Sequence, residues 1–168
     1  MAETTTNDTE TLHDHLKGIC YTMFTTRAGE RLRSRPMTTI ETEERGDLLL
    51  FLGNDGSELL HDIAGDSRVN LAYSDNDGGR YVSVSGTATS RDDRAMIKEL
   101  WNPILKAWWD GPDDPAIRVI EVRIQEAEYW AGPRSKVVRF VGILAAAVSG
   151  DAYDEGEHGT VEVGARIR

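Results

Sequence analysis

The sequence has little of what would tie a chain to a membrane or to a disulfide framework. Cys20 is its only cysteine, which excludes an intrachain disulfide and a thiolate metal cluster. This cysteine lies in the apolar run ICYTMF, so we expect it to be buried rather than reactive. No apolar run approaches the roughly 18 residues that a membrane-spanning helix requires. The N-terminus is acidic and polar and does not resemble a signal peptide, so we expect a cytoplasmic protein.

Positive charge is also scarce. The 168 residues include 19 lysines and arginines against 29 aspartates and glutamates, which gives a net charge of −10. Nucleic acid and anionic membranes both require a positive face, so we expect neither as a main partner. The four histidines are too scattered to suggest a metal site. No Ser-His-Asp or Cys-His arrangement can be argued, so the sequence predicts no catalytic residue and no metal ligand.

The patterning of the chain is mainly that of strands. Stretches with alternating apolar residues, or rich in β-branched and aromatic residues, lie at 18–27, 31–41, 48–52, 68–75, 80–90 and 116–130. Pro36 inside the second stretch indicates an edge strand or a bulge. The third, LLLFL, is uniformly apolar, which indicates burial on both faces. Because strands follow strands through short connections, the order predicts an antiparallel barrel or sandwich flanked by helices.

Four helices are expected between and around these strands, at 9–17, 57–64, about 93–108 and 135–150. The third has the strongest signal, because Ser90 and Asp93 have capping-box spacing and apolar residues then recur at i, i+3 and i+4. On that helix Trp101 and Trp108 share the apolar stripe, whereas Trp109 lies off it and could face a dimer partner.

The chain is expected to have one globular domain. We assign residues 1–8 to a flexible N-terminus and residues 9–150 to the domain, with the C-terminal helix included. Residues 151–168 form an acidic, glycine-rich tail, in which TVEV (160–163) could add an edge strand.

The stretch FLGNDGSELLHDI (51–63) runs from a strand through a turn into a helix. Asp55 and Ser57 both suit the N-cap, and Glu58 has capping-box spacing from Asp55. Unpaired amides at a helix N-terminus attract anions, yet these thirteen residues contain no lysine or arginine. The stretch is either an anion site without its own cation or simply a well-capped helix.

Three arginines could supply the missing charge. Arg31, Arg33 and Arg35 are spaced by two in an expected strand, so they point to the same face. A guanidinium suits phosphate, but three such side chains could equally form a solvated strand face. Both interpretations stay open at this stage.

Segments 32–37 (LRSRPM), 82–88 (VSVSGTA) and 99–130 (ELWNPILKAWWDGPDDPAIRVIEVRIQEAEYW) together carry a family resemblance. They are similar to the flavin-binding split-barrel proteins related to pyridoxamine 5′-phosphate oxidase, and within these to the general stress protein 26 group. The resemblance covers about residues 12–150. It implies a mainly β fold, a six-stranded antiparallel split β-barrel with flanking helices. It also implies a homodimer with flavin mononucleotide (FMN) sites at the subunit interface.

The resemblance further implies which residues contact the flavin. Arg35 matches the arginine that reaches the flavin phosphate, while Ser57 and Leu59 match a phosphate-binding serine and lysine. Glu58 stands at a position that is often basic in the oxidases. The main chain that lines the ring edge falls on Pro36, Met37, Thr38 and Thr39, and two strand residues before the helix fall on Leu52 and Gly53. A polar contact to the ring falls on Tyr81, and an aromatic residue supplied by the partner subunit falls on Trp130. Trp130 could alternatively plug a barrel end.

These implications lead to one main interpretation and two alternatives. The main one is a homodimeric, FMN-binding, stress-related oxidoreductase that acts on a small molecule. One alternative is a non-enzymatic dimer with a weakened or lost flavin site that serves as a binding or stress module. The other is a different cofactor, such as a deazaflavin or haem. The oxidases' C-terminal substrate motif is absent, so we do not expect pyridoxamine 5′-phosphate oxidase activity.

Overall fold

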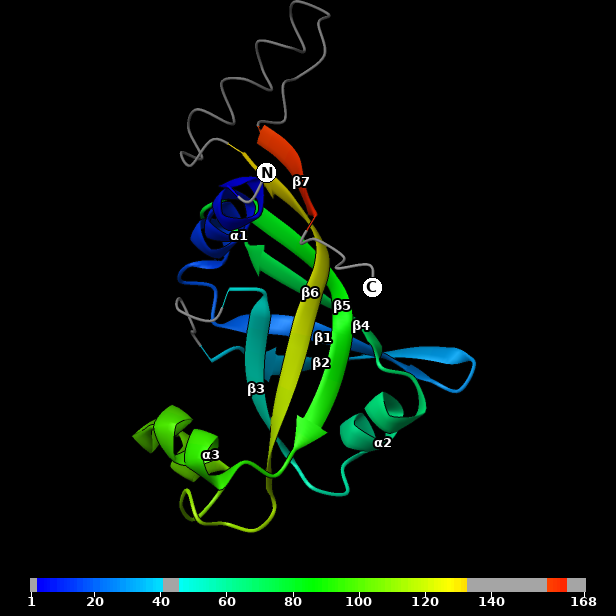
Figure 1. Cartoon of the computed structure of the whole chain (residues 1–168), viewed down its shortest axis with the longest axis vertical. Coiled ribbons are helices and arrows are strands. Elements are labelled where there is room, and N and C mark those ends of the chain that lie inside the picture. The colour runs from blue at the N-terminus through cyan, green and yellow to red at the C-terminus, as the bar shows by residue number, and fades with distance from the viewer. Residues whose placement is uncertain (1–2, 41–45, 133–156, 163–168) are drawn as a thin grey trace, which may run out of the picture.

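The computed structural model describes residues 3–40, 46–132 and 157–162 (Figure 1). Its strands form a seven-stranded antiparallel sheet, flanked by helices. The strands are β1 (Tyr21–Ala28), β2 (Arg31–Thr38), β3 (Leu48–Asn54), β4 (Arg68–Asp75), β5 (Arg80–Arg91), β6 (Ile117–Ala131) and β7 (Glu157–Glu162). The helices are α1 (Glu3–Leu16), α2 (Glu58–Gly65) and α3 (Arg94–Leu100), followed by the 3₁₀ turn η1 (Pro103–Ala107). This confirms the predicted mainly β, antiparallel fold with flanking helices.

The sheet has the order β2-β1-β4-β5-β6-β3, and β7 adds to the distal part of β6. The seventh strand is a correction to the six that were expected, and it includes part of TVEV. Pro36 lies in β2, at the end of this order, as its missing N–H predicts. The sheet is not closed, but Ile40 beyond β2 makes an isolated bridge with Leu50 of β3. The two ends of the order therefore meet, as in a split barrel.

A β-bulge interrupts the pairing of the two longest strands. Ser85 of β5 pairs with Glu126 of β6, but Gly86 pairs with Ile124, which leaves Gln125 as an extra residue. A Cβ on Gly86 would overlap the carbonyl oxygen of Arg123, so only glycine fits at this close approach.

The core forms two clusters on either side of β3. Leu49 and Phe51 belong to the larger cluster, inside the curled sheet with α2, whereas Leu50 and Leu52 belong to the smaller one beneath α3 and η1. Both faces of β3 are therefore buried, which confirms the expectation for LLLFL.

Helix α1 begins earlier than the sequence suggested. It starts at Glu3 rather than Thr9, so it includes most of the residues assigned to a flexible N-terminus. Leu12 is fully buried, as the helical spacing predicted. Arg80 ties the end of α1 to the sheet, because its guanidinium donates to carbonyls of Asp14, His15 and Lys17 at 3.1–3.4 Å.

Helix α2 is capped by Ser57, whose hydroxyl accepts a hydrogen bond from the Leu60 amide at 3.4 Å. The expected Asp55–Glu58 capping box is wrong, because both carboxylates bind arginines instead. Asp55 accepts from Arg118 and Glu58 accepts from Arg33, each at 2.7 Å. Charge-assisted bonds of this kind are stronger than the cap contacts that they replace.

The single long helix expected after Ser90 is also wrong. Pro103 has no amide hydrogen and restricts the residue before it, so Asn102 is extended at φ −136° and ψ 159°. Helix α3 ends at Leu100, and Asn102 caps η1. The cap of α3 is Asp93, whereas Ser90 lies in β5, so the Ser90–Asp93 capping box does not form.

This break reverses the expected roles of the adjacent tryptophans. Trp109 is 9% exposed and packs in the smaller core cluster, while Trp108 is 60% exposed. The helical stripe does not continue past Pro103, so spacing across the proline predicted the wrong tryptophan.

Cys20 is exposed, which corrects the expectation of burial. It lies in the connection before β1, where the alternation of the strand has not begun. The expected helix at 135–150, and residues 151–156 and 163–168 of the expected tail, lie outside the described residues. Within the described ranges, no helix is both long and apolar enough to cross a membrane.

Candidate functional site

The candidate phosphate arginine, Arg35, is already bound to an anion of its own chain. Its guanidinium donates to the Asp62 carboxylate at 2.9 Å and to the Thr26 hydroxyl at 3.0 Å. Thr26 in turn donates to the same Asp62 oxygen at 2.8 Å, which closes a triangle between β1, β2 and α2. The side chain of Asp62 is 5% exposed and that of Arg35 is 20% exposed. The pair is therefore largely shielded from water.

The protonation of Asp62 reflects this pairing. Burial alone would raise the pKa of its carboxyl group. Hydrogen bonds from Thr26 and Arg35, together with the charges of Arg33 and Arg35, outweigh burial and hold the pKa below its ordinary value. Asp62 is consequently a carboxylate at neutral pH, and Arg35 faces a full negative charge.

Arg33 faces the same helix. It donates to Glu58 at 2.7 Å and lies 3.7 Å from Asp62, so both arginines lean over the first turns of α2. The expectation that they share a face is confirmed, and the interpretation of that face as merely solvated is wrong for these two. Their partners Glu58 and Asp62 are four apart on α2, the spacing that places two side chains on one helical face.

The turn before α2 offers few open positions to a ligand. Leu52 and Leu59 are 7% and 5% exposed and belong to the two core clusters. A Cβ on Gly53 would lie 2.9 Å from Cδ1 of Ile120, so a side chain there requires core residues to move. Ser57 is half-buried and its hydroxyl is used as the helix cap.

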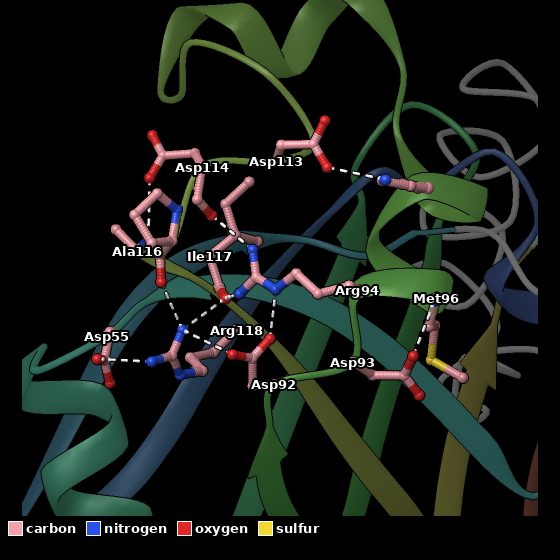
Figure 2. Close-up of polar contacts among 12 residues, drawn as sticks. Asp55, Asp92, Asp93, Arg94, Met96, Asp113, Asp114, Ala116, Ile117 and Arg118 are labelled. Carbon is pink, nitrogen blue, oxygen red and sulfur yellow. Dashed lines mark hydrogen bonds and ion pairs between the residues drawn. The ribbon is translucent and has the colours of Figure 1, made fainter.

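A polar network fixes this turn from outside (Figure 2). Arg118 donates to Asp55 at 2.7 Å and to the carbonyls of Pro115 and Ile117 at 2.7 and 2.9 Å. The Asp55 amide donates to the Ala116 carbonyl at 2.7 Å. The start of β6 thus holds the turn in place.

Trp109 contributes a second tether. Its indole N–H donates to the side chain of Asn54 at 2.6 Å. Arg94 donates to the Asp114 and Ile117 carbonyls at 2.7 Å each (Figure 2). The segment that carries the family resemblance therefore buttresses the turn before α2.

A second group of predicted residues lies on the outer face of the sheet. Tyr81 of β5 is paired directly with Trp130 of β6, and the two are 42% and 40% exposed. Trp130 also stacks on His158 of β7, with ring centroids 5.1 Å apart. On the same face β1 exposes Tyr21, 67% exposed, opposite Thr38 of β2. Large apolar surface is thus uncovered here.

The segment at the ring-edge positions lies at the end of β2. Pro36 and Thr38 are exposed on the outer face, whereas Met37 packs against the larger core cluster. The hydroxyl of Thr39, just beyond the strand, is 2.9 Å from that of Tyr73. Their side chains therefore divide between the two faces of the sheet.

The predicted site residues do not all meet within one chain. Gly53 pairs with Arg118 near the start of β6, whereas Tyr81 pairs with Trp130 near its end. At about 3.3 Å per residue, Arg118 and Trp130 are separated by roughly 40 Å along the strand. Ser57 and Leu59 are at the first end with Arg35 nearby, and Tyr81 and Trp130 are at the other.

Three residues that control the α2 end were not predicted from the sequence. Asp62, Arg118 and Trp109 were not singled out as site residues, although each fixes a predicted one or the turn that carries it. The helical spacing of Glu58 and Asp62, opposite arginines spaced by two on a strand, was a usable signal for Asp62. No local signal marks Arg118.

Comparisons with known proteins agree with this architecture. Residues 7–154 match the family described as "Pyridoxamine 5′-phosphate oxidase like". Protein bli-3 of Neurospora crassa is 32% identical over 141 residues, covering 77% of this chain and 68% of that protein.

Two solved structures have a similar fold. A general stress protein 26 from Jannaschia sp. CCS1 has a TM-score of 0.75 at 23% identity, covering 93% of this chain and 98% of that one. The general stress FMN/FAD binding protein of Xanthomonas citri has a TM-score of 0.64 at 28% identity, covering 74% and 89%. With the match over residues 7–154, the chain belongs to the pyridoxamine 5′-phosphate oxidase-like family.

Proposed function

We propose that this chain forms a homodimer that binds a flavin, such as the FMN that the family resemblance implies, between the two copies. The observation that carries the proposal is the division of the predicted contacts between the two ends of the long strand β6. A small molecule cannot bridge roughly 40 Å of strand, so one site needs the α2 end of one copy and the Tyr81–Trp130 pair of another.

The exposed outer face supports the dimer. Large apolar side chains from four strands are exposed on it, and large exposed apolar surface marks interaction sites. They are Tyr21, Met23, Leu32, Tyr81 and Trp130. The relative from Xanthomonas citri, described as FMN/FAD binding, supports the choice of ligand.

The residues present fit the ring of a flavin better than its phosphate. Exposed aromatic side chains suit stacking against a flat heterocycle. At the α2 end, by contrast, Arg35 and Arg33 are bound to carboxylates of the chain itself. A bound flavin would supply the hydride or electron transfer of an oxidoreductase acting on a small molecule. The chain's part is to bind and orient the ring. The cytoplasmic location stays a prediction from the sequence.

The pairing of those arginines also favours a second candidate function. A dimer whose phosphate contacts are neutralised could hold flavin too weakly for turnover and act as a non-enzymatic binding module. The two candidates differ in the fraction of flavin retained through purification.

Purified protein tests the proposal directly. We expect a mass of twice 18.6 kDa by light scattering, and quenching of FMN fluorescence on titration. A monomer that leaves FMN fluorescence unchanged would contradict it. A dimer that is colourless as isolated but quenches added FMN would favour the binding module.

A further inference from the structure

We infer that Asp62 is a specificity-determining residue of the proposed flavin site. Its carboxylate already binds Arg35, the arginine that a ligand's phosphate would need. The site would then select flavins by their ring and discriminate little between FMN and riboflavin. The inference rests on the proposed function and goes beyond it, since it names the part of the ligand that is recognised.

The local charges around the turn and α2 carry the argument. In the described part of the chain, the arginines that approach the turn and the first turns of α2 are Arg33, Arg35 and Arg118, and each is within 2.9 Å of a carboxylate oxygen. The three carboxylates belong to Glu58, Asp62 and Asp55. These arginines and carboxylates sum to no net charge. A phosphate monoester brings about −1.5 to −2 charges at pH 7, so it adds unbalanced negative charge.

The three pairs are not equally easy to break. Glu58 is 81% exposed and Asp55 is 56% exposed, so water readily replaces either. Asp62 is 5% exposed and accepts from both Arg35 and Thr26. Releasing Arg35 would leave a buried carboxylate without its hydrogen-bonded cation and with only Arg33, 3.7 Å away, to balance it, which is a costly state. Asp62 therefore competes with phosphate more strongly than the other two.

The alternative source of phosphate binding is the helix itself, and it is weak here. The hydroxyl of Ser57 caps α2, and the carboxylate of Glu58 stands in its first turn. Leu59, at the position of the family's lysine, faces the core. None of these three side chains adds positive charge to compensate for the loss of Arg35.

The test compares the dissociation constants of FMN and riboflavin, measured by fluorescence quenching. In the wild type we expect FMN to bind less than tenfold more tightly than riboflavin. Asp62→Asn should raise this preference at least tenfold, because an arginine–phosphate contact is worth about that factor or more. Adding Arg35→Gln to Asp62→Asn should return the preference to the wild-type value, since the gain runs through Arg35.

Asp66→Asn is the matched control. It removes the same charge at the other end of α2, where Asp66 binds Arg68 and lies 3.6 Å from Arg27, and it should leave the preference unchanged. Should Asp62→Asn fail to fold, two measurements still test the inference. The wild-type preference for FMN over riboflavin should be below tenfold, and Glu58→Gln, at the exposed pair, should raise this preference by a smaller factor than is expected for Asp62→Asn.

A wild-type preference for FMN above tenfold, or a folded Asp62→Asn protein without a gain, would overturn the inference. Absence of binding by both flavins would instead overturn the proposed function, and the inference would fall with it. The two failures are thus distinguishable.

Discussion

The α2 end and the outer face of the sheet differ in whether their side chains already have partners within the chain. At the α2 end, charged side chains find partners within the chain, and Arg35, Thr26 and Asp62 leave little unsatisfied. On the outer face, Tyr81 and Trp130 keep about two fifths of their surface in water. A ligand or partner must displace existing bonds at the first region, whereas burial alone drives binding at the second.

Breaking the Arg35–Asp62 pair should have the largest effect on stability. Arg35→Met removes the hydrogen-bonded cation of the buried Asp62 carboxylate and leaves only Arg33, 3.7 Å away, so we expect unfolding to become easier by about 2–3 kcal/mol at pH 7. The exposed fifth of Arg35 makes this less than for a fully buried pair. Urea unfolding provides the measurement, with Lys98→Met, whose ion pair with Asp113 is exposed on both sides, as a control expected to lose about 0–1 kcal/mol.

The pH dependence sharpens this prediction. The pKa of Asp62 is lowered in the folded wild type, so its pairing contributes stability above the ordinary value of 3.8 and loses it as pH falls through the lowered pKa. Without Arg35, burial should raise that pKa. The deficit of Arg35→Met should therefore be largest at neutral pH and shrink below about pH 4. A deficit that does not change with pH would contradict the assigned charge pair.

The outer face is tested by removing its tryptophan. Trp130→Ala should weaken dimerisation and FMN binding by roughly tenfold or more, the scale of an aromatic side chain buried at an interface. Trp108→Ala removes a tryptophan that is 60% exposed next to η1, and serves as the matched control. Equal losses in the two variants, measured by sedimentation and flavin titration, would argue against an interface at Trp130.

The buttress of the turn is tested by two adjacent tryptophans. Trp109→Phe removes the 2.6 Å hydrogen bond to Asn54 and should cost about 1 kcal/mol in urea unfolding. Trp108→Phe should change stability by less than about 0.5 kcal/mol, as is usual for exposed sites. A larger loss of stability in Trp108→Phe than in Trp109→Phe would instead support the continuous helix that the sequence suggested.

The smallest expected effect is at the helix cap. Ser57→Ala removes the hydroxyl that accepts from the Leu60 amide and should destabilise the protein by about 0.5–1 kcal/mol. Ser90→Ala, at the cap predicted from sequence but located in β5, should be close to neutral. A larger loss of stability in Ser90→Ala than in Ser57→Ala would support the Ser90–Asp93 capping box that the structure does not show.

The sequence predicted the strands well because a period of two is visible locally. Alternation marked the strands, Pro36 marked an edge, and the apolar β3 marked double burial. It failed where a single residue overrode a pattern, as Pro103 did in the expected helix. It also failed for Asp62, because the orientation of α2 against β2 is a tertiary property. The assignment of flavin contacts stays a prediction, and the structure divides those residues between two regions.

The bulge at Gly86 has a consequence for which aromatic ring the protein displays. Before it, Ile124 of β6 points inward, and strict alternation from there would turn Trp130 inward and Tyr129 outward. The extra residue Gln125 shifts the phase, so Tyr129 is 9% exposed and Trp130 faces out. One inserted position, accommodated by one glycine, thus decides the chemical identity of the outer surface.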